Sequence, residues 1–358
     1  MANKVTGKTD TSGALTTAPV AIKSIIIVAP VSGTQGEDVT IREKEIFTIT
    51  GTADATSVFG STSIAPKMVK TLISNGVDNI KGIIVPAEGD NALADTLAVT
   101  MEDKTIKIVI CVDNEASTIA AVKDHLILCE NNDMFRYSVF APSSDDASNQ
   151  TKLTEFASTV NSDRIFIPGA EMLNGADAVE PQITASGLAA AIMTETDDPA
   201  LPMNGVAILG FSGIKRQMLE SEMKALANAG VTAITMEGNT PTVYRLVTSK
   251  LSATGTTDPV WQEGTTRFIA DYVLESNMNM LRANYKRTKN VQRVLDGIKS
   301  DIKINMEKME GAEIIENWDE STLTVIKDPK DAYGALVDYE FDVVTPLYTI
   351  TITQHMKL

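Results

Sequence analysis

Residues 106–113 read IKIVICVD, an apolar run of strand-forming residues that ends in an aspartate. Similar short apolar runs recur along the first two-thirds of the chain, at residues 21–29, 82–86, 136–142, 164–168 and 206–211. Segments with the hydrophobic period of a helix separate them, at residues 61–75, 115–129, 151–160, 181–194 and 215–229. Strands of continuous apolar residues that alternate with helices are typical of a parallel sheet covered on both faces. The sequence therefore predicts an α/β fold with a largely parallel, helix-covered sheet.

The pattern changes after Gly230. Two β-rich runs around the turn GNTP come first, then two helical patterns, then two runs with a period of two, at residues 231–236, 242–248, 265–285, 291–309, 337–343 and 348–352. A period of two is that of a strand with one buried face. We therefore expect a C-terminal region of helices and antiparallel strands after the parallel sheet, which makes the fold α+β overall.

The composition excludes several classes of partner. The chain has 358 residues, 43% of them hydrophobic, and a formal net charge of −16. Such an acidic surface repels nucleic acid and anionic lipid, so neither nucleic acid nor a membrane is expected as a partner. The first residues contain no apolar segment typical of a secretion signal. We expect the chain to be made and folded in the cytosol.

The residues that usually carry chemistry are scarce. The two cysteines, Cys111 and Cys129, lie in apolar runs and are expected to be buried, reduced thiols. The only histidines, His125 and His355, are too few for a histidine-based metal site or a catalytic triad.

Two glycine-containing segments resemble known motifs only in part. GTQGED at residues 33–38 follows a predicted strand but lacks the Lys and Ser/Thr of a phosphate loop. GFSGIK at residues 210–215 has one residue too few for a nucleophile elbow. We therefore expect no cofactor, no metal and no catalytic residue, and predict that the chain is not an enzyme.

A cluster of basic residues reverses the sign of the charge locally. No acidic residue lies between Ser276 and Leu295, and this stretch contains Arg282, Lys286, Arg287, Lys289 and Arg293. Arg282, Lys286 and Lys289 recur at helical spacing and could share one face. Two interpretations are open: a solvated helix surface, or a cationic face that docks an acidic partner.

The chain ends in a predicted strand in which Tyr348, Ile350 and Ile352 alternate with threonines. Chain ends usually fray unless something holds them. This strand could be an edge strand of its own sheet, or it could add to the sheet of a neighbouring molecule.

Four segments together resemble the contractile tail sheath proteins of bacteriophages and phage-tail-like particles, with the greatest similarity to the sheath type of Mu-like phages. They are AAAIMTETDDPALPMNGVAILGF, GVTAITMEGNTPTVYRLVTSK, TRFIADYVLESNMNMLRANYKR and VVTPLYTITITQ, at residues 189–211, 230–250, 266–287 and 343–354. The resemblance is strongest in the second half of the chain and is carried by diffuse patterns.

The resemblance implies a structural subunit that polymerises as a six-fold helical sleeve around an inner tube. Contraction of the sleeve would drive the tube through a target cell envelope without nucleotide hydrolysis. The implied partners are other copies of the chain, the inner tail tube protein, and baseplate and tail terminator proteins. The assembly would form in the bacterial cytoplasm and belong to a virion tail or to a released particle such as a bacteriocin or another contractile injection system.

The resemblance also implies a division of the chain. We predict an N-terminal extended arm at residues 1–28, an α/β sheath region at 29–230, a C-terminal core region at 231–342 and a C-terminal arm strand at 343–358. Strand exchange between subunits would use the two arms, through Ala21, Ile22, Ile25, Tyr348, Ile350 and Ile352. The tube-facing basic face would consist of Arg282, Lys286, Arg287, Lys289 and Arg293.

Other functions remain open from the residues alone. The parallel sheet also fits a nucleotide- or sugar-dependent cytosolic enzyme, although no glycine-rich fingerprint supports one. A two-lobed solute-binding protein would normally carry an export signal. Another homo-polymeric tube or shell subunit would differ from a sheath in lacking a separate inner tube.

Overall fold

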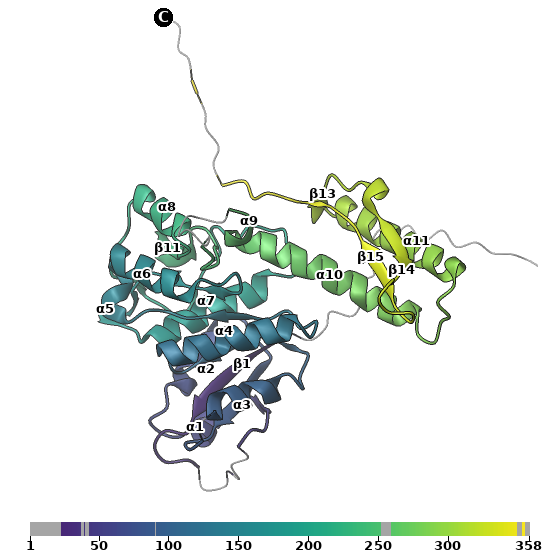
Figure 1. The fold of residues 1–358 in the computed structure, drawn as a ribbon. Helices are drawn as coiled ribbons and strands as arrows, with labels where there is room; N and C mark the ends of the chain where they lie inside the picture. The colour runs from purple at the N-terminus through teal and green to yellow at the C-terminus, as the bar shows by residue number, and fades with distance from the viewer. Residues whose placement is uncertain are drawn as a thin grey trace, which may run out of the picture.

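The computed structural model describes residues 23–36, 39, 43–89, 91–251, 259–348 and 353–354. It consists of an α/β body and a smaller C-terminal lobe, which the long helix α10 (Gly264–Asn284) carries outward from the body (Figure 1). We use "body" for the described residues up to 263 and "lobe" for residues 292–343.

The body is built on a six-stranded sheet in the order β2-β3-β1-β4-β5-β6. The strands are β2 (Phe47–Ile49), β3 (Ile80–Val85), β1 (Ser24–Pro30), β4 (Ile106–Cys111), β5 (Tyr137–Val139) and β6 (Ile165–Phe166). Only the edge strand β2 is antiparallel to its neighbour, and every other pair is parallel. The predicted largely parallel sheet is confirmed.

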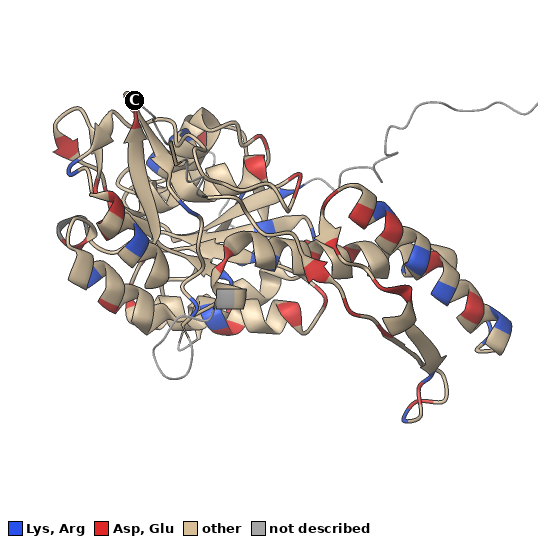
Figure 2. Ribbon diagram, turned by 90° about the horizontal axis from the view of Figure 1, so that it is seen from above, with Lys and Arg blue, Asp and Glu red and all other residues tan. Residues whose placement is uncertain are grey.

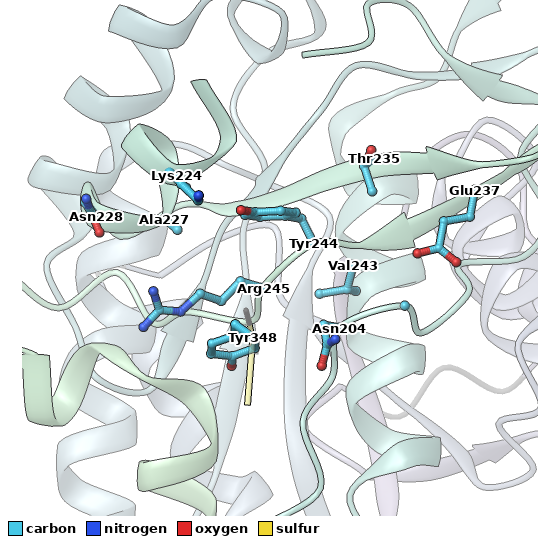
Figure 3. A pocket seen from close by; sticks show the side chains of 11 residues that line it. Asn204, Lys224, Ala227, Asn228, Thr235, Glu237, Val243, Tyr244, Arg245 and Tyr348 are labelled. Carbon is cyan, nitrogen blue, oxygen red and sulfur yellow. The ribbon is translucent and has the colours of Figure 1, made fainter. Parts of the chain in front are cut away.

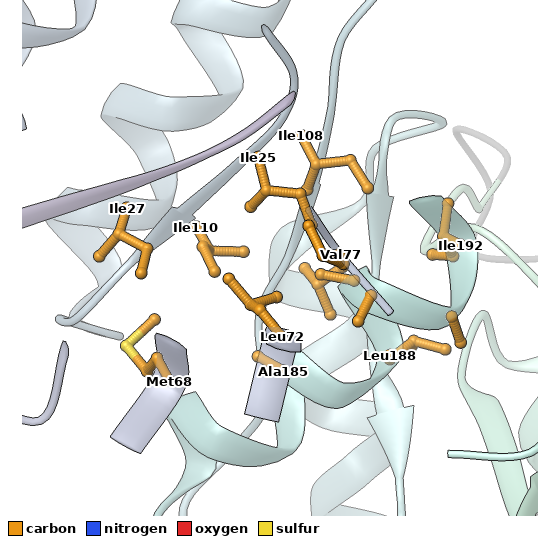
Figure 4. Close-up of a cluster of buried hydrophobic side chains, with 14 of the residues drawn as sticks. Ile25, Ile27, Met68, Leu72, Val77, Ile108, Ile110, Ala185, Leu188 and Ile192 are labelled. Carbon is orange, nitrogen blue, oxygen red and sulfur yellow. The ribbon is translucent and has the colours of Figure 1, made fainter. Parts of the chain in front are cut away.

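Successive residues of β1 point to opposite faces of the sheet. Ile25 and Ile27 pack into one core beneath the helices α1 (Thr52–Phe59), α2 (Ala65–Ser74) and α7 (Pro181–Glu195) (Figure 4). Ile26 and Val28 pack into a second core. The helices on that side are α3 (Ala92–Thr100), α4 (Ala116–Glu130), α6 (Gln150–Val160) and α8 (Glu220–Asn228). A strand buried on both faces must be apolar throughout, which explains the unbroken runs in the sequence.

One predicted arm residue lies in this sheet. Ile25 is completely buried, and its strand β1 pairs with β3 on one side and β4 on the other. Both edges of the strand are therefore occupied by the same chain, and the prediction that Ile25 pairs with another subunit is wrong. The described part of this apolar run forms a central strand because its side chains fill both cores.

Short strands extend the body beyond the main sheet. β11 (Thr232–Glu237) and β12 (Thr240–Val243) form the predicted hairpin, and β11 also runs parallel to β7 (Pro168–Gly169). A second small sheet contains β8 (Met172–Asn174), β9 (Asp177–Ala178) and β10 (Gly213–Ile214). The short helices α5 (Ser144–Ala147) and α9 (Pro259–Gln262) complete the described elements of the body.

The predicted strand at residues 206–211 is wrong, because it is reduced to an isolated bridge between Ala207 and Thr242. Gly205 and Gly210 adopt φ of 79° and 90°, and such left-handed backbone interrupts an extended run. The helix predicted from residue 215 begins only at Glu220, because bends and irregular structure follow β10 at residues 215–219.

The lobe is formed by helix α11 (Gln292–Gly311) and two small antiparallel sheets. β13 (Ile315–Glu316) pairs with β16 (Asp342–Val343), and β14 (Thr324–Lys327) pairs with β15 (Ala335–Asp338), with the short 3-10 helix η1 (Glu320–Thr322) between β13 and β14. Ile302, Met306 and Met309 of α11 form its core with residues of α10. This arrangement confirms the predicted C-terminal region of helices and antiparallel strands.

Candidate assembly surfaces

The five predicted basic residues lie around the free end of the hairpin that α10 and α11 form. Arg282 is in the last turn of α10 and Arg293 in the first turn of α11, while Lys286, Arg287 and Lys289 lie in the loop between the helices. All five side chains are exposed. The predicted single helix face is wrong in detail, because α10 ends at Asn284 before the loop lysines. We call these residues the basic tip.

The basic tip has a defined backbone. Arg287 adopts a φ of 58°, which reverses the chain between the helices. The Tyr285 hydroxyl donates a hydrogen bond of 2.9 Å to Asp301 of α11, so the loop is held against the second helix.

The charges of the basic tip are only partly neutralised. Arg282 forms an ion pair of 2.7 Å with Asp133 of the body. Within the part of the chain that the structure describes, no ion pair joins the other four cations to a carboxylate. Acidic and basic residues alternate along the rest of α11 (Figure 2). The tip is thus a small cationic surface at the end of a helix of mixed charge.

The first residues of the predicted C-terminal arm lie against their own chain. After β16 the chain runs back from the lobe towards α9 and the body (Figure 1). There the Tyr348 hydroxyl donates a hydrogen bond of 2.6 Å to Glu263, and its ring lies 4.9 Å from the guanidinium carbon of Arg245. Tyr348 therefore anchors the base of the arm, which differs from its predicted place in an inter-subunit strand. Ala21, Ile22, Ile350 and Ile352 lie outside the described residues.

The charges around the Tyr348 hydroxyl favour its hydrogen bond to Glu263. Glu263 is buried and receives two hydrogen bonds, of 2.9 and 2.8 Å, from the Arg245 guanidinium. Burial of the Tyr348 hydroxyl, together with the neighbouring Glu263 carboxylate, raises its pKa well above the usual range. The phenol therefore stays protonated and donates to the carboxylate.

A cavity of about 370 Å³ lies beside this anchor (Figure 3). Tyr348 and Arg245 form one wall, and Lys224 and Asn228 of α8 approach from another side. Its charges are mixed, since Glu237 also lines it. This combination does not have the backbone cradle or clustered cations of a phosphate site.

The described residues contain no group of three or more His, Cys, Asp or Glu side chains that could hold a metal ion. Both cysteines are free and buried, as predicted. Burial raises the pKa of Cys111 to about 12 and also raises that of Cys129. Burial lowers the pKa of His125 to about 4, with the nearby Arg136 as a second cause. These groups are held in unreactive forms.

The sequence analysis missed one exposed hairpin. β14 and β15 pair only with each other among the described residues, so each strand has one open edge. The paired residues Ile326 and Leu336 are 52% and 45% exposed. The sequence signal for this hairpin was weak, because β14 has only four residues and follows closely after the 3-10 helix η1.

Residues 256–357 match the family model of the phage tail sheath C-terminal domain. The C-terminal part of the chain is a phage tail sheath domain. The match covers α10, the basic tip, the lobe and the base of the arm. None of the curated proteins matches the chain in sequence.

Solved structures extend the similarity in fold to the whole length of the chain. The helical sheath of the anti-feeding prophage in its contracted state is 15% identical, with a TM-score of 0.70 and 99% of each chain covered. A chain in the baseplate structure of the same particle is also 15% identical, with a TM-score of 0.71 and coverage of 100% of this chain and 99% of that chain.

The sheath tail protein of Desulfitobacterium hafniense is 10% identical, with a TM-score of 0.64 and coverage of 96% of this chain and 100% of that chain. The C-terminal domain thus matches the tail sheath family, and the fold of the full length is that of contractile tail sheath proteins. The predicted resemblance to tail sheath proteins is confirmed. The matching family is structural, which agrees with the prediction that the chain is not an enzyme.

Proposed function

We propose that this sheath protein polymerises with copies of itself as a six-fold helical sleeve around an inner tube, and that the sleeve contracts to drive the tube through a target envelope. The sheath domain at residues 256–357 carries the proposal, because it contains the elements that project from the body. Its fold is shared with a sheath seen in a contracted helical state.

The two arms connect neighbouring subunits in this proposal. The N-terminal arm precedes Ser24 and contains Ala21 and Ile22, and the C-terminal arm follows Tyr348 and contains Ile350 and Ile352. Strand addition suits this role because main-chain hydrogen bonds keep subunits connected while they change orientation. The open edges of β14 and β15 offer positions at which such strands can add.

The basic tip faces the inner tube in this proposal. Four of its cations have no carboxylate partner among the described residues, although the chain carries a formal charge of −16. Exposed ion pairs contribute only about 0–1 kcal/mol each. Several such pairs can guide assembly on an acidic tube surface and still be released during contraction.

Contraction itself draws on free energy stored at assembly. Subunits leave the tube as nearly rigid bodies and bury more surface against one another, and each ring switches the next. This mechanism requires no nucleotide.

The remaining partners follow from the same proposal. The similarity to a chain in a contractile baseplate structure supports contact with a baseplate, and a tail terminator would close the opposite end. The sleeve would assemble in the bacterial cytoplasm and leave as part of a virion tail or a phage-tail-like particle. Within the described residues, no helix combines the length and apolar character needed to cross a membrane.

Negative-stain electron microscopy of the purified protein, with and without its tube protein, tests this function. We expect six-fold sleeves whose length follows that of the tube. Particles that remain monomeric with the tube protein, or shells that form without a central channel, would contradict the proposal.

A further inference from the structure

Helix α10 has two faces of different chemistry. Arg267, Asp271, Glu275 and Arg282 lie along one stripe and form ion pairs with residues of the body or with each other. Ile269 and Val273 lie on another stripe and pack against the apolar core of the lobe. The helix therefore contacts the body largely through charged groups and the lobe largely through apolar ones.

Five charged side chains form what we call the joint cluster: Glu130, Asp163, Arg164, Arg267 and Asp271. Arg164, Arg267 and Asp271 are only 1%, 7% and 4% exposed. Glu130 is the last residue of α4, and Asp163 and Arg164 immediately precede β6. The cluster thus fixes α10 to two elements of the body at once.

Asp271 is the centre of this cluster. Its carboxylate accepts hydrogen bonds of 2.7 and 3.0 Å from Arg164, and of 2.6 and 3.2 Å from Arg267. The Tyr137 hydroxyl of β5 donates a fifth, of 2.5 Å. One side chain of α10 therefore accepts hydrogen bonds from strand β5, from the residue that precedes β6 and from the preceding turn of its own helix.

Beneath Asp271 the contact is apolar and less specific. Phe268 of α10 packs on Tyr137 and Phe166, with ring centroids 5.0 and 5.7 Å apart. Apolar surfaces tolerate small shifts and rotations of a helix, whereas a carboxylate with five donors has one favourable position. Buried ionic groups contribute little net stability and are best explained by the geometry that they fix.

The geometry of α10 sets the position of the lobe. In the described residues the chain enters the lobe through α10 and returns to the body at Tyr348. Asn277 lies about 1.7 turns beyond Asp271 by the helical repeat of about 3.6 residues. Its side-chain amide donates a hydrogen bond of 3.1 Å to the Tyr339 hydroxyl of the lobe. A rotation of α10 on the body would thus be transmitted directly to the lobe, the basic tip and the arm.

We propose that Asp271 is a positioning residue that fixes the register of α10 on the body and thereby makes body and lobe one rigid unit during contraction. This inference rests on the proposed sheath function, since it assigns the movement to the arms and to subunit contacts and excludes a hinge in α10. It concerns the interior of a single subunit, so it can be tested whether or not sleeves form.

The test measures the distance between body and lobe by double electron–electron resonance. Spin labels are placed at Lys152→Cys in α6 and Lys299→Cys in α11, two exposed positions. The native thiols are buried and will not be labelled under native conditions. The labelled chain is diluted into an excess of unlabelled chain, so that only distances within one subunit are recorded.

We expect a single narrow distance peak in the otherwise unaltered chain and its loss in Asp271→Asn. The double variant Arg267→Gln/Asp271→Asn removes one charge of each sign, so it separates register from charge imbalance, and we expect it to lose the narrow peak as well. Glu275→Gln is the matched control one turn along α10, where the pair with Lys107 is partly exposed, and it should keep the peak.

A narrow, unshifted peak in either folded Asp271 variant would overturn the proposal. Hydrogen exchange on the unaltered chain supplies a test that needs no variant. We expect amides of the first half of α10 to exchange as slowly as those of β4 and β5. Faster exchange there than in both strands would show that the joint is not rigid.

Discussion

The Tyr348 hydroxyl donates a hydrogen bond of 2.6 Å to Glu263, a residue 85 positions earlier in the chain. Glu263 immediately precedes α10, and Tyr348 is the last described residue of the segment that returns from the lobe. The contact closes the lobe into a loop whose two ends meet on the body. In the proposed sleeve, the C-terminal arm would therefore start from this anchored residue.

Replacement of Tyr348 should weaken this anchor without unfolding the body. Tyr348→Phe removes one hydrogen bond to a carboxylate, which costs about 1–3 kcal/mol. Tyr348→Ala also removes the contact with Arg245, worth a further ~0.5–2 kcal/mol. We expect lower melting temperatures in that order by calorimetry, and fewer or shorter sleeves by electron microscopy.

Tyr333 offers the control for the anchor experiment, because its side chain is 94% exposed in the β14–β15 loop. Tyr333→Ala should leave the melting temperature unchanged. An equal loss of stability in the Tyr333 and Tyr348 variants would show that the hydrogen bond to Glu263 has no specific role.

The sequence predicted the parallel sheet well because burial on both faces leaves a simple signal. The unbroken apolar run at residues 106–113 corresponds to β4, and the alternation at 337–343 includes part of β15. Helices α1 and α3 were missed, since TADATSVF contains many residues of low helix propensity and ALADTLAVT is short and mixes Ala and Leu with Asp, Thr and Val. Their helical state depends on packing against α2 and α4, which local patterns do not encode.

The candidate assembly surfaces were less predictable. The basic residues are obvious in the sequence, yet their arrangement depends on where α10 ends and on the reversed backbone at Arg287. The joint cluster depends on Glu130, Arg164 and Asp271, which lie far apart in the chain and meet only in the folded state. Long-range ion pairs leave no periodic signal, so no reading of spacing could have found them.

Reversal of charge at the basic tip should separate tube binding from self-assembly. In the triple variant Lys286→Glu/Arg287→Glu/Lys289→Glu, the tip would repel an acidic tube surface. We therefore expect loss of co-assembly with the tube protein in pelleting assays. Polymers without a tube should still form. The loss should be strongest at low salt, where repulsion between exposed charges is least screened.

A matched control changes the total charge equally on the body. Lys70, Lys104 and Lys152 are exposed, and their replacement by Glu lowers the net charge by the same amount, since each change removes one positive and adds one negative charge. This variant should still bind the tube. Equal loss of binding in both triple variants would mean that net charge decides, and would contradict a specific role of the tip.

Removal of residues 349–358 should abolish sleeves and spare the subunit. Tyr348 and its anchor are retained in this truncation, so we expect a melting temperature close to that of the full chain. The point variant Ile350→Lys/Ile352→Lys tests the same arm by placing charges on the apolar side of its predicted strand, and Thr349→Ser/Thr351→Ser is its conservative control. Normal sleeves from the truncated chain would refute the C-terminal arm as a connector.

A buried histidine should make the stability of the body depend on pH. The Nε2 atom of His125 lies 3.2 Å from the Arg136 guanidinium, and a nitrogen that accepts a hydrogen bond from a cation must be unprotonated. Burial, and then the charge of Arg136, lower the pKa of His125 to about 4 from 6.5 in the unfolded chain. The unfolded chain therefore takes up a proton below pH 6.5, while the folded chain does so only near pH 4. The contribution of this group to stability is complete above pH 6.5, and the free energy of unfolding should fall by up to about 3 kcal/mol as the pH drops to 4.

Urea unfolding at intervals across this window measures how the free energy of unfolding changes with pH. The variant His125→Gln cannot titrate there, so its slope should be flatter than that of the unaltered chain. An identical slope in both proteins would show that His125 is not the group that titrates.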